Sequence, residues 1–106
     1  MATVEIQSGI CGHVTTVKAV GGEAYKVHMS IESTCPHVWK ISGDVDEVDA
    51  LQQIALRDGL PSVLDSAYSH CVHAACPVPS GLIKAIEVAA GLALPQDVSM
   101  RVSKEE

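Results

Sequence analysis

The sequence predicts a single α+β domain over residues 1–106, in which about four helices cover one face of a small, mostly antiparallel sheet. Three observations predict this fold class. The first third of the chain alternates apolar and polar residues as strands do, and apolar residues at helical spacing dominate from residue 36 to residue 92. Strand-like alternation then returns near the C-terminus. A length of 106 residues supports one domain.

Three strands are expected to form a meander at the start of the chain. Thr3–Gln7 alternates valine and isoleucine with polar residues, and His13–Val20 is rich in β-branched residues. Tyr25–Ser33 carries apolar residues at every second position, so one of its faces is expected to pack and the other to meet water. Gly21–Glu23 marks the hairpin turn, with glycine expected to supply the positive φ.

Helices are expected over most of the remaining chain. Pro36–Gly43 starts with proline and stops at glycine, and an acidic run from Asp44 to Asp49 fits the solvated first turn of the next helix. Apolar spacing predicts the other three helices, the last with Ser80 as its N-cap, over Asp46–Asp58, Leu60–His70 and Ser80–Leu92. Val98, Met100 and Val102 alternate with polar residues and predict a C-terminal strand, which adds to the three-strand meander.

Composition argues against several classes of function. Thirteen acidic and seven basic residues give a net charge of −6, which repels phosphate backbones, and there is no Phe to stack on bases. We therefore expect no nucleic-acid partner. No apolar run is long enough to span a bilayer, and the N-terminus lacks the features of a signal peptide. These observations predict no membrane partner and a cytoplasmic location, where thiols are normally reduced.

Four cysteines lie in segments interrupted by glycine or proline, in the motifs "CGH", "CPH" and "CVHAACP". In a meander the first and third strands run parallel, so Cys11 and Cys35 are expected to emerge at the same end of the sheet. Proline follows Cys76 directly and excludes a helical conformation there, so Cys71 and Cys76 are expected to lie on either side of a loop. The sequence thus predicts that all four sulfurs gather at one rim.

A metal centre is the function that this ligand set favours. Four thiolates satisfy either tetrahedral zinc or an iron–sulfur cluster, with Cys11, Cys35, Cys71 and Cys76 as the predicted ligands. Four histidines each lie within two residues of a cysteine and are candidate substitute ligands or hydrogen-bond partners of a ligand: His13, His37, His70 and His73. Such a centre would serve electron transfer, cluster carriage or sensing, and its partner would be a redox or cluster-acceptor protein.

Two other interpretations stay open at this point. Cys71 and Cys76 could form the dithiol of a thiol-redox protein, although the four-residue spacing differs from that of the C-x-x-C oxidoreductases. The chain could instead be an interaction domain with reduced, unligated cysteines, dimeric through an exposed sheet edge. The sequence identifies no positioned acid or base with a partner, so an enzyme is the less favoured class.

The stretches "SGICG", "STCPHV" and "CVHAACPVPSGLIKAIEVAAGLALPQDVSM" together resemble a family of short uncharacterised cysteine-motif proteins from anaerobic microbes. The resemblance covers nearly the whole chain and brings no established activity. It implies a small domain with cysteine motifs in an anaerobic setting. That setting favours an iron–sulfur cluster over zinc.

Overall fold

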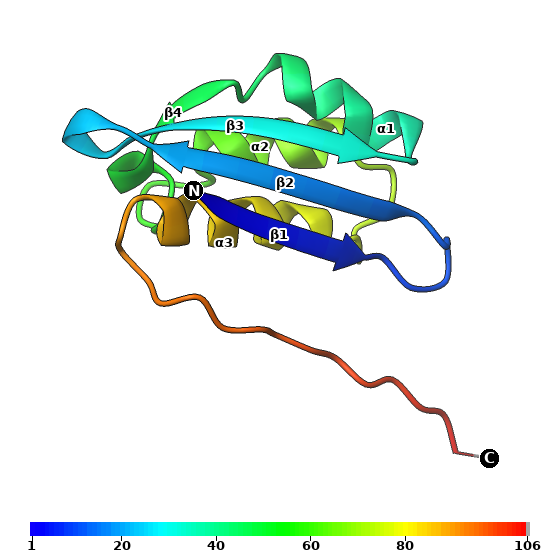
Figure 1. The fold of residues 1–106 in the computed structure, drawn as a ribbon. Coiled ribbons are helices and arrows are strands. Elements are labelled where there is room, and N and C mark those ends of the chain that lie inside the picture. The colour runs from blue at the N-terminus through cyan, green and yellow to red at the C-terminus, as the bar shows by residue number, and fades with distance from the viewer. Residues whose placement is uncertain (106) are drawn as a thin grey trace.

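A computed structural model describes residues 1–105, in which one antiparallel sheet has the strand order β1-β2-β3-β4 (Figure 1). The strands are β1 (Ala2–Gln7), β2 (Val14–Gly21), β3 (Lys26–Ser33) and β4 (Glu47–Asp49). The α-helices are α1 (Pro36–Trp39), α2 (Ser62–His70) and α3 (Val78–Ala89). Short 3-10 turns cover Glu23–Tyr25, Lys40–Gly43 and Ala50–Gln52. The predicted α+β class is confirmed, with three helices over residues 1–105 in place of about four.

The core lies between the sheet and the helices on one of its faces (Figure 1). The first three strands are the predicted meander, with Val17 opposite Val4 on one side and opposite Ile31 on the other. Helix α3 packs across β1 and β2, and α2 lies beside it. The core is aliphatic, and its largest fully buried side chains include Val17, Val27, Ile41, Val45, Val63, Val78, Leu82 and Ile86.

Two glycines let α3 approach the sheet closely. A Cβ at Gly81 would collide with the Ile6 side chain on β1, and a Cβ at Gly21 would collide with the Ala89 carbonyl. The second collision is with the backbone, so a side chain there would displace the end of α3. Gly21 therefore sets the distance between helix and sheet.

The β2–β3 hairpin is present, but its glycines do not supply the positive φ that the sequence predicted. Gly22 is extended at φ −126, and the positive values belong to Ala24 and Tyr25, at 54 and 61. The prediction that glycine supplies the positive φ was therefore wrong. Glycine is required at position 21 by close packing against α3, and not by the geometry of the turn.

The predicted helix over Asp46–Asp58 is wrong. Residues 47–49 pair with β3 as strand β4, where Val48 lies opposite Val27, and a 3-10 turn follows at residues 50–52. The helical spacing was misleading, because Leu51 is about half exposed, at 53%. Buried Gln53 then accepts a hydrogen bond from the Val63 N–H at 2.9 Å, which satisfies a free donor at the start of α2.

The predicted C-terminal strand is also absent from the part of the chain that the structure describes. Residues 94–105, here called the C-terminal tail, are exposed and carry no regular secondary structure. The sheet takes its fourth strand from residues 47–49 in their place.

The remaining helices match the predictions closely. Pro36–Gly43 is α1 followed by a 3-10 turn, and α2 begins directly after Pro61. Helix α3 starts two residues earlier than predicted, so Ser80 lies inside its first turn and Pro77 holds the N-cap position. No helix in residues 1–105 has the length and apolar character needed to cross a membrane.

Candidate functional site: a thiol cluster at one end of the sheet

Three connections meet at one end of the sheet, on the right in Figure 1. They are the β1–β2 loop, the junction between β3 and α1, and the α2–α3 connection. The first two are joined by the contact between His13 Nδ1 and the Thr34 hydroxyl, at 2.9 Å. We call this region the cysteine end, because it holds Cys11, Cys35, Cys71 and Cys76.

Cys71 and Cys76 form the closest pair of thiols. Cys71 is the C-cap of α2, with its N–H bonded to the Ala67 carbonyl, and Cys76 lies one residue before the Pro77 that caps α3. Their sulfurs are 3.9 Å apart. The predicted loop between them is confirmed, and both side chains are half-buried against the core.

Cys35 is the third half-buried thiol and is the N-cap residue of α1. Its N–H donates to the Ser33 hydroxyl at 3.0 Å, and that hydroxyl lies 2.8 Å from the hydroxyl of fully buried Thr15. The backbone at Cys35 is therefore fixed by the sheet. Pro36 keeps Cys35 extended, at φ −85 and ψ 120, as expected for a residue before proline.

Cys11 differs from the other three, because it is exposed in the β1–β2 loop. That loop turns through Gly9 and Gly12, both with positive φ, and the Gly12 N–H donates to the Gly9 carbonyl at 2.9 Å. The structure thus places Cys11 at the predicted end of the sheet without packing it against the core.

The pKa of the Cys71 thiol is raised from 9.0 to about 12. Burial is the main cause, followed by repulsion from a Cys76 thiolate, the hydrogen bond with Cys76 and repulsion from Cys35. Cys35 therefore acts on the Cys71 pKa in the same direction as Cys76. Repulsion of this kind disfavours thiolate unless a cation compensates the charge.

The four histidines near the cysteines have different surroundings. His13 Nδ1 lies 2.9 Å from the Thr34 hydroxyl, His37 is half-buried on α1, and His73 is exposed in the α2–α3 loop. His70 Nε2 lies 2.9 Å from an Asp44 carboxylate oxygen, which also accepts a hydrogen bond from Ser66 at 2.9 Å.

The hydrogen bonds from His70 and then Ser66 lower the pKa of Asp44 below 3.8. The sequence interpretation of Asp44 as part of a solvated helix start is wrong, since it is the C-cap of the 3-10 turn at residues 40–43 and contacts α2. No local signal could have shown this, because Asp44 and His70 are 26 residues apart.

Within residues 1–105 no three His, Cys, Asp or Glu side chains stand at distances that would already hold a metal ion. The Cys71–Cys76 pair nevertheless has suitable spacing. Two thiolates bound to one tetrahedral zinc at about 2.3 Å lie about 3.8 Å apart. The observed 3.9 Å between the Cys71 and Cys76 sulfurs matches that separation. A metal bound by this pair also needs Cys35 and a fourth ligand, and both would have to move towards the pair.

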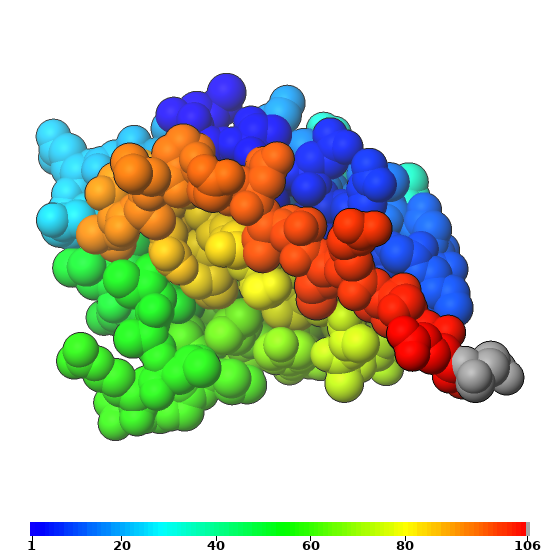
Figure 2. Space-filling model, turned by 90° about the horizontal axis from the view of Figure 1, so that it is seen from below, coloured from blue at the N-terminus to red at the C-terminus, as the bar shows by residue number. Residues whose placement is uncertain are grey.

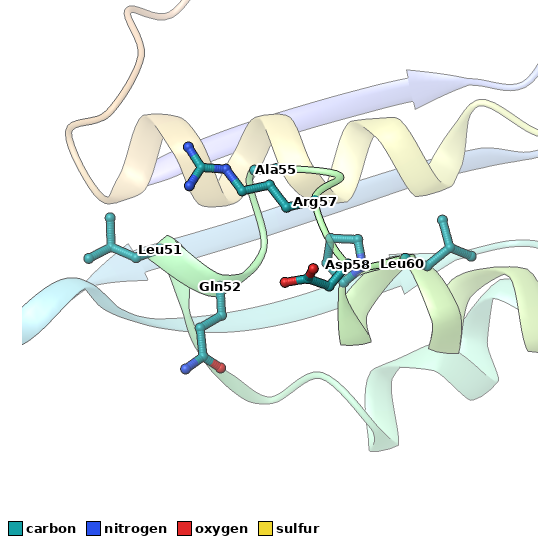
Figure 3. A pocket seen from close by; sticks show the side chains of 8 residues that line it. Leu51, Gln52, Ala55, Arg57, Asp58 and Leu60 are labelled. Carbon is teal, nitrogen blue, oxygen red and sulfur yellow. The ribbon is translucent and has the colours of Figure 1, made fainter.

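Two surface hollows carry no comparable chemistry. One, of about 290 Å³, is lined by residues between Leu51 and Pro61, and Figure 3 shows Leu51 and Leu60 projecting in opposite directions from it. Arg57 and Asp58 are its charged residues. The other, of about 260 Å³, lies in the β1–β2 loop beside His13. Ser8 and His13 both line the second hollow, and the side-chain hydrogen bond of His13 goes to Thr34.

The fold and the site define a small α+β protein with helices on one face of an antiparallel sheet and four cysteines at one end of that sheet, two of them with sulfurs 3.9 Å apart. Residues 2–102 match the model of DUF6951, a family of unknown function, and the chain belongs to this family. No curated protein and no solved structure matches the chain.

Proposed function

We propose that the protein binds one thiophilic metal ion of the zinc class at the cysteine end, through Cys35, Cys71 and Cys76, with Cys11 as the fourth ligand. The observation that supports this proposal is the 3.9 Å separation of the Cys71 and Cys76 sulfurs, which suits two ligands of one tetrahedral ion. Cys35 lies near enough to influence the Cys71 thiol. Cys11 lies in an exposed loop at the same end.

The spacing also bears on the choice between zinc and an iron–sulfur cluster. In a [4Fe–4S] cluster each cysteine binds a different iron, which separates the sulfurs more widely than two ligands of one ion. In a [2Fe–2S] cluster two cysteines share an iron, as they would share zinc. The pair therefore supports zinc first and a [2Fe–2S] cluster second. Zinc would suit a sensing role, and a cluster would suit electron transfer or carriage to an acceptor protein.

A dithiol–disulfide couple is the second candidate, and the same sulfur pair supports it. An external disulfide could oxidise Cys71 and Cys76 by exchange, releasing its own two thiols as the new bond forms at about 2.05 Å. The raised pKa of Cys71 disfavours the thiolate that this exchange needs. We therefore rank metal binding above the redox couple.

Metal binding is tested on the reduced, metal-free chain under nitrogen. We expect one zinc or cobalt per chain, and cobalt spectra with intense thiolate charge-transfer bands. Cys71→Ser should weaken zinc binding by more than the roughly 10–100-fold loss caused by removing an outer partner of a ligand, because it removes a ligand. Competition with a chromophoric chelator measures the affinity.

His28→Gln is the matched control. His28 lies on β3 with its side chain 58% exposed, next to Glu47, and this variant should bind zinc as the wild type does. Brown colour with stoichiometric sulfide after iron reconstitution would identify the centre as an iron–sulfur cluster in place of zinc. A chain that retains no metal but cycles between dithiol and disulfide would establish the redox function in its place.

A further inference from the structure

The two edges of the sheet differ in how they are protected. The edge strand β4 has only three residues, two of them acidic, and leads directly into a 3-10 turn. Short and charged edges resist pairing with other strands. At the other edge β1 has six residues with one charge, Glu5, and within residues 1–105 it pairs only with β2. Every second residue of β1 therefore directs its backbone N–H and C=O away from the sheet.

The C-terminal tail has the pattern of a strand that could use these groups. Val98, Met100 and Val102 alternate with polar residues and are between 69% (Val98) and 94% (Val102) exposed. Figure 2 shows the tail, coloured orange to red, crossing the side of the molecule on which β1 and α3 are visible. The family model extends to residue 102, so this segment belongs to the domain that defines the family.

The two segments are complementary in side chains as well as in backbone. On β1, Val4 and Ile6 face the core and Glu5 faces water. If Arg101 lies opposite Glu5, Met100 and Val102 lie beside Val4 and Ile6, whether the strands run parallel or antiparallel. The apolar side chains then extend the covered face of the sheet, and an opposite-charge pair forms on the exposed face.

A second copy of the chain is the occupant that the structure favours. The tail leaves α3 near the start of β1, on the left in Figure 1, and runs away from the sheet without joining its ladder. The outer edge of β1 therefore has no strand partner within residues 1–105, and three apolar side chains of the tail stay in water. A second copy offers the same edge and the same tail, so two reciprocal additions close a symmetric dimer.

We propose that residues 97–103 of one copy add as a fifth strand to the outer edge of β1 of a second copy, and reciprocally, to form a two-fold dimer. This inference is independent of metal binding. Sedimentation velocity from 1 to 100 µM tests it, with a reductant and a chelator present, so that neither a Cys11 disulfide nor a shared metal joins the copies. We expect a dimer.

Met100→Asp places a charge on the inner face of the added strand and should raise the dimer dissociation constant by about a hundredfold or more. Ser99→Asp adds the same charge one residue away, on the face open to water, and should leave the dimer intact. Glu5→Arg and Arg101→Glu should each weaken the dimer a few-fold, and the double variant should restore it.

Hydrogen exchange of residues 97–103 completes the test. Amides protected in a dimer, and unprotected after Met100→Asp, support the proposal. A chain that stays monomeric at 100 µM overturns it, and protected tail amides in that monomer would assign the tail to its own β1. A dimer that survives deletion of residues 94–106 also overturns it, because another surface would then join the copies.

Discussion

Cys11 and the other three cysteines meet at one end of the molecule but are held in different ways. Cys35, Cys71 and Cys76 lie at helix ends, half-buried against the core. Cys11 is exposed in a loop shaped by two glycines with positive φ. Three thiols are therefore placed by the packing of the whole domain, and the fourth only by its own loop. If these four thiols form the proposed ligand set, three ligands are its fixed part and Cys11 is its movable part.

The largest difference between the two parts should be seen in alkylation of the metal-free, reduced chain. A Cys71 pKa of about 12 in place of 9.0 lowers its thiolate fraction at pH 8 roughly a thousandfold. A thiolate of higher pKa is also more nucleophilic, and this raises the reaction rate about 20-fold and offsets part of the loss. Cys71 should thus react with iodoacetamide about 50-fold more slowly than in the urea-unfolded chain. Peptide mass spectrometry measures the rates. Cys71 reacting before exposed Cys11 would contradict the structure.

A smaller effect is expected when Cys11, the movable member of the proposed ligand set, is replaced. Cys11→Ser should weaken zinc binding about tenfold, less than Cys71→Ser, because ordering an exposed loop offsets part of what its thiolate contributes. Chelator competition on both variants gives the ratio. Equal losses would mean that the β1–β2 loop is already held in place, and no loss would mean that the fourth ligand is another group.

The smallest effect should follow Asp44→Asn, which alters the contact with His70 beside the fixed part. The Asp44 pKa is lowered in the folded chain, so its contribution to stability is present above pH 3.8 and is lost as pH falls through the folded value. The variant should melt slightly below the wild type at pH 7, and the two curves should converge in strong acid. Zinc affinity should not change. Removing a hydrogen-bond partner of a metal ligand typically weakens metal binding roughly 10–100-fold. A loss of zinc affinity of that size in Asp44→Asn would identify His70 as a ligand.

The first three strands were predictable because alternation of apolar residues is a local property that survives in the fold. The segment after residue 46 was not, since Val48 fits a helical stripe and a strand pair equally well, and only its partner Val27 decides between them. The tail shows the converse. Its alternation is real, but a strand also needs an edge to join, and sequence pattern cannot say whose edge that is.

The cysteine end was partly predictable for the same reason. Once the meander was recognised, the shared end of β1 and β3 brought Cys11 and Cys35 to one side, and proline placed Cys76 in a loop. The sequence could not show that Cys71 is buried enough to raise its pKa, or that Asp44 contacts α2. Both depend on packing between segments far apart in the chain.

The connection between Cys71 and Cys76 links the end of α2 to the start of α3, the two helices that contribute Val63, Ala67, Leu82 and Ile86 to the core. Whatever joins those sulfurs would also resist separation of the helices. A ligand at a hundred times its dissociation constant adds about 2.7 kcal/mol to the free energy of unfolding. If the proposed metal ion is that ligand, the lifetime of the chain in a cell that degrades unfolded proteins would follow its metal supply.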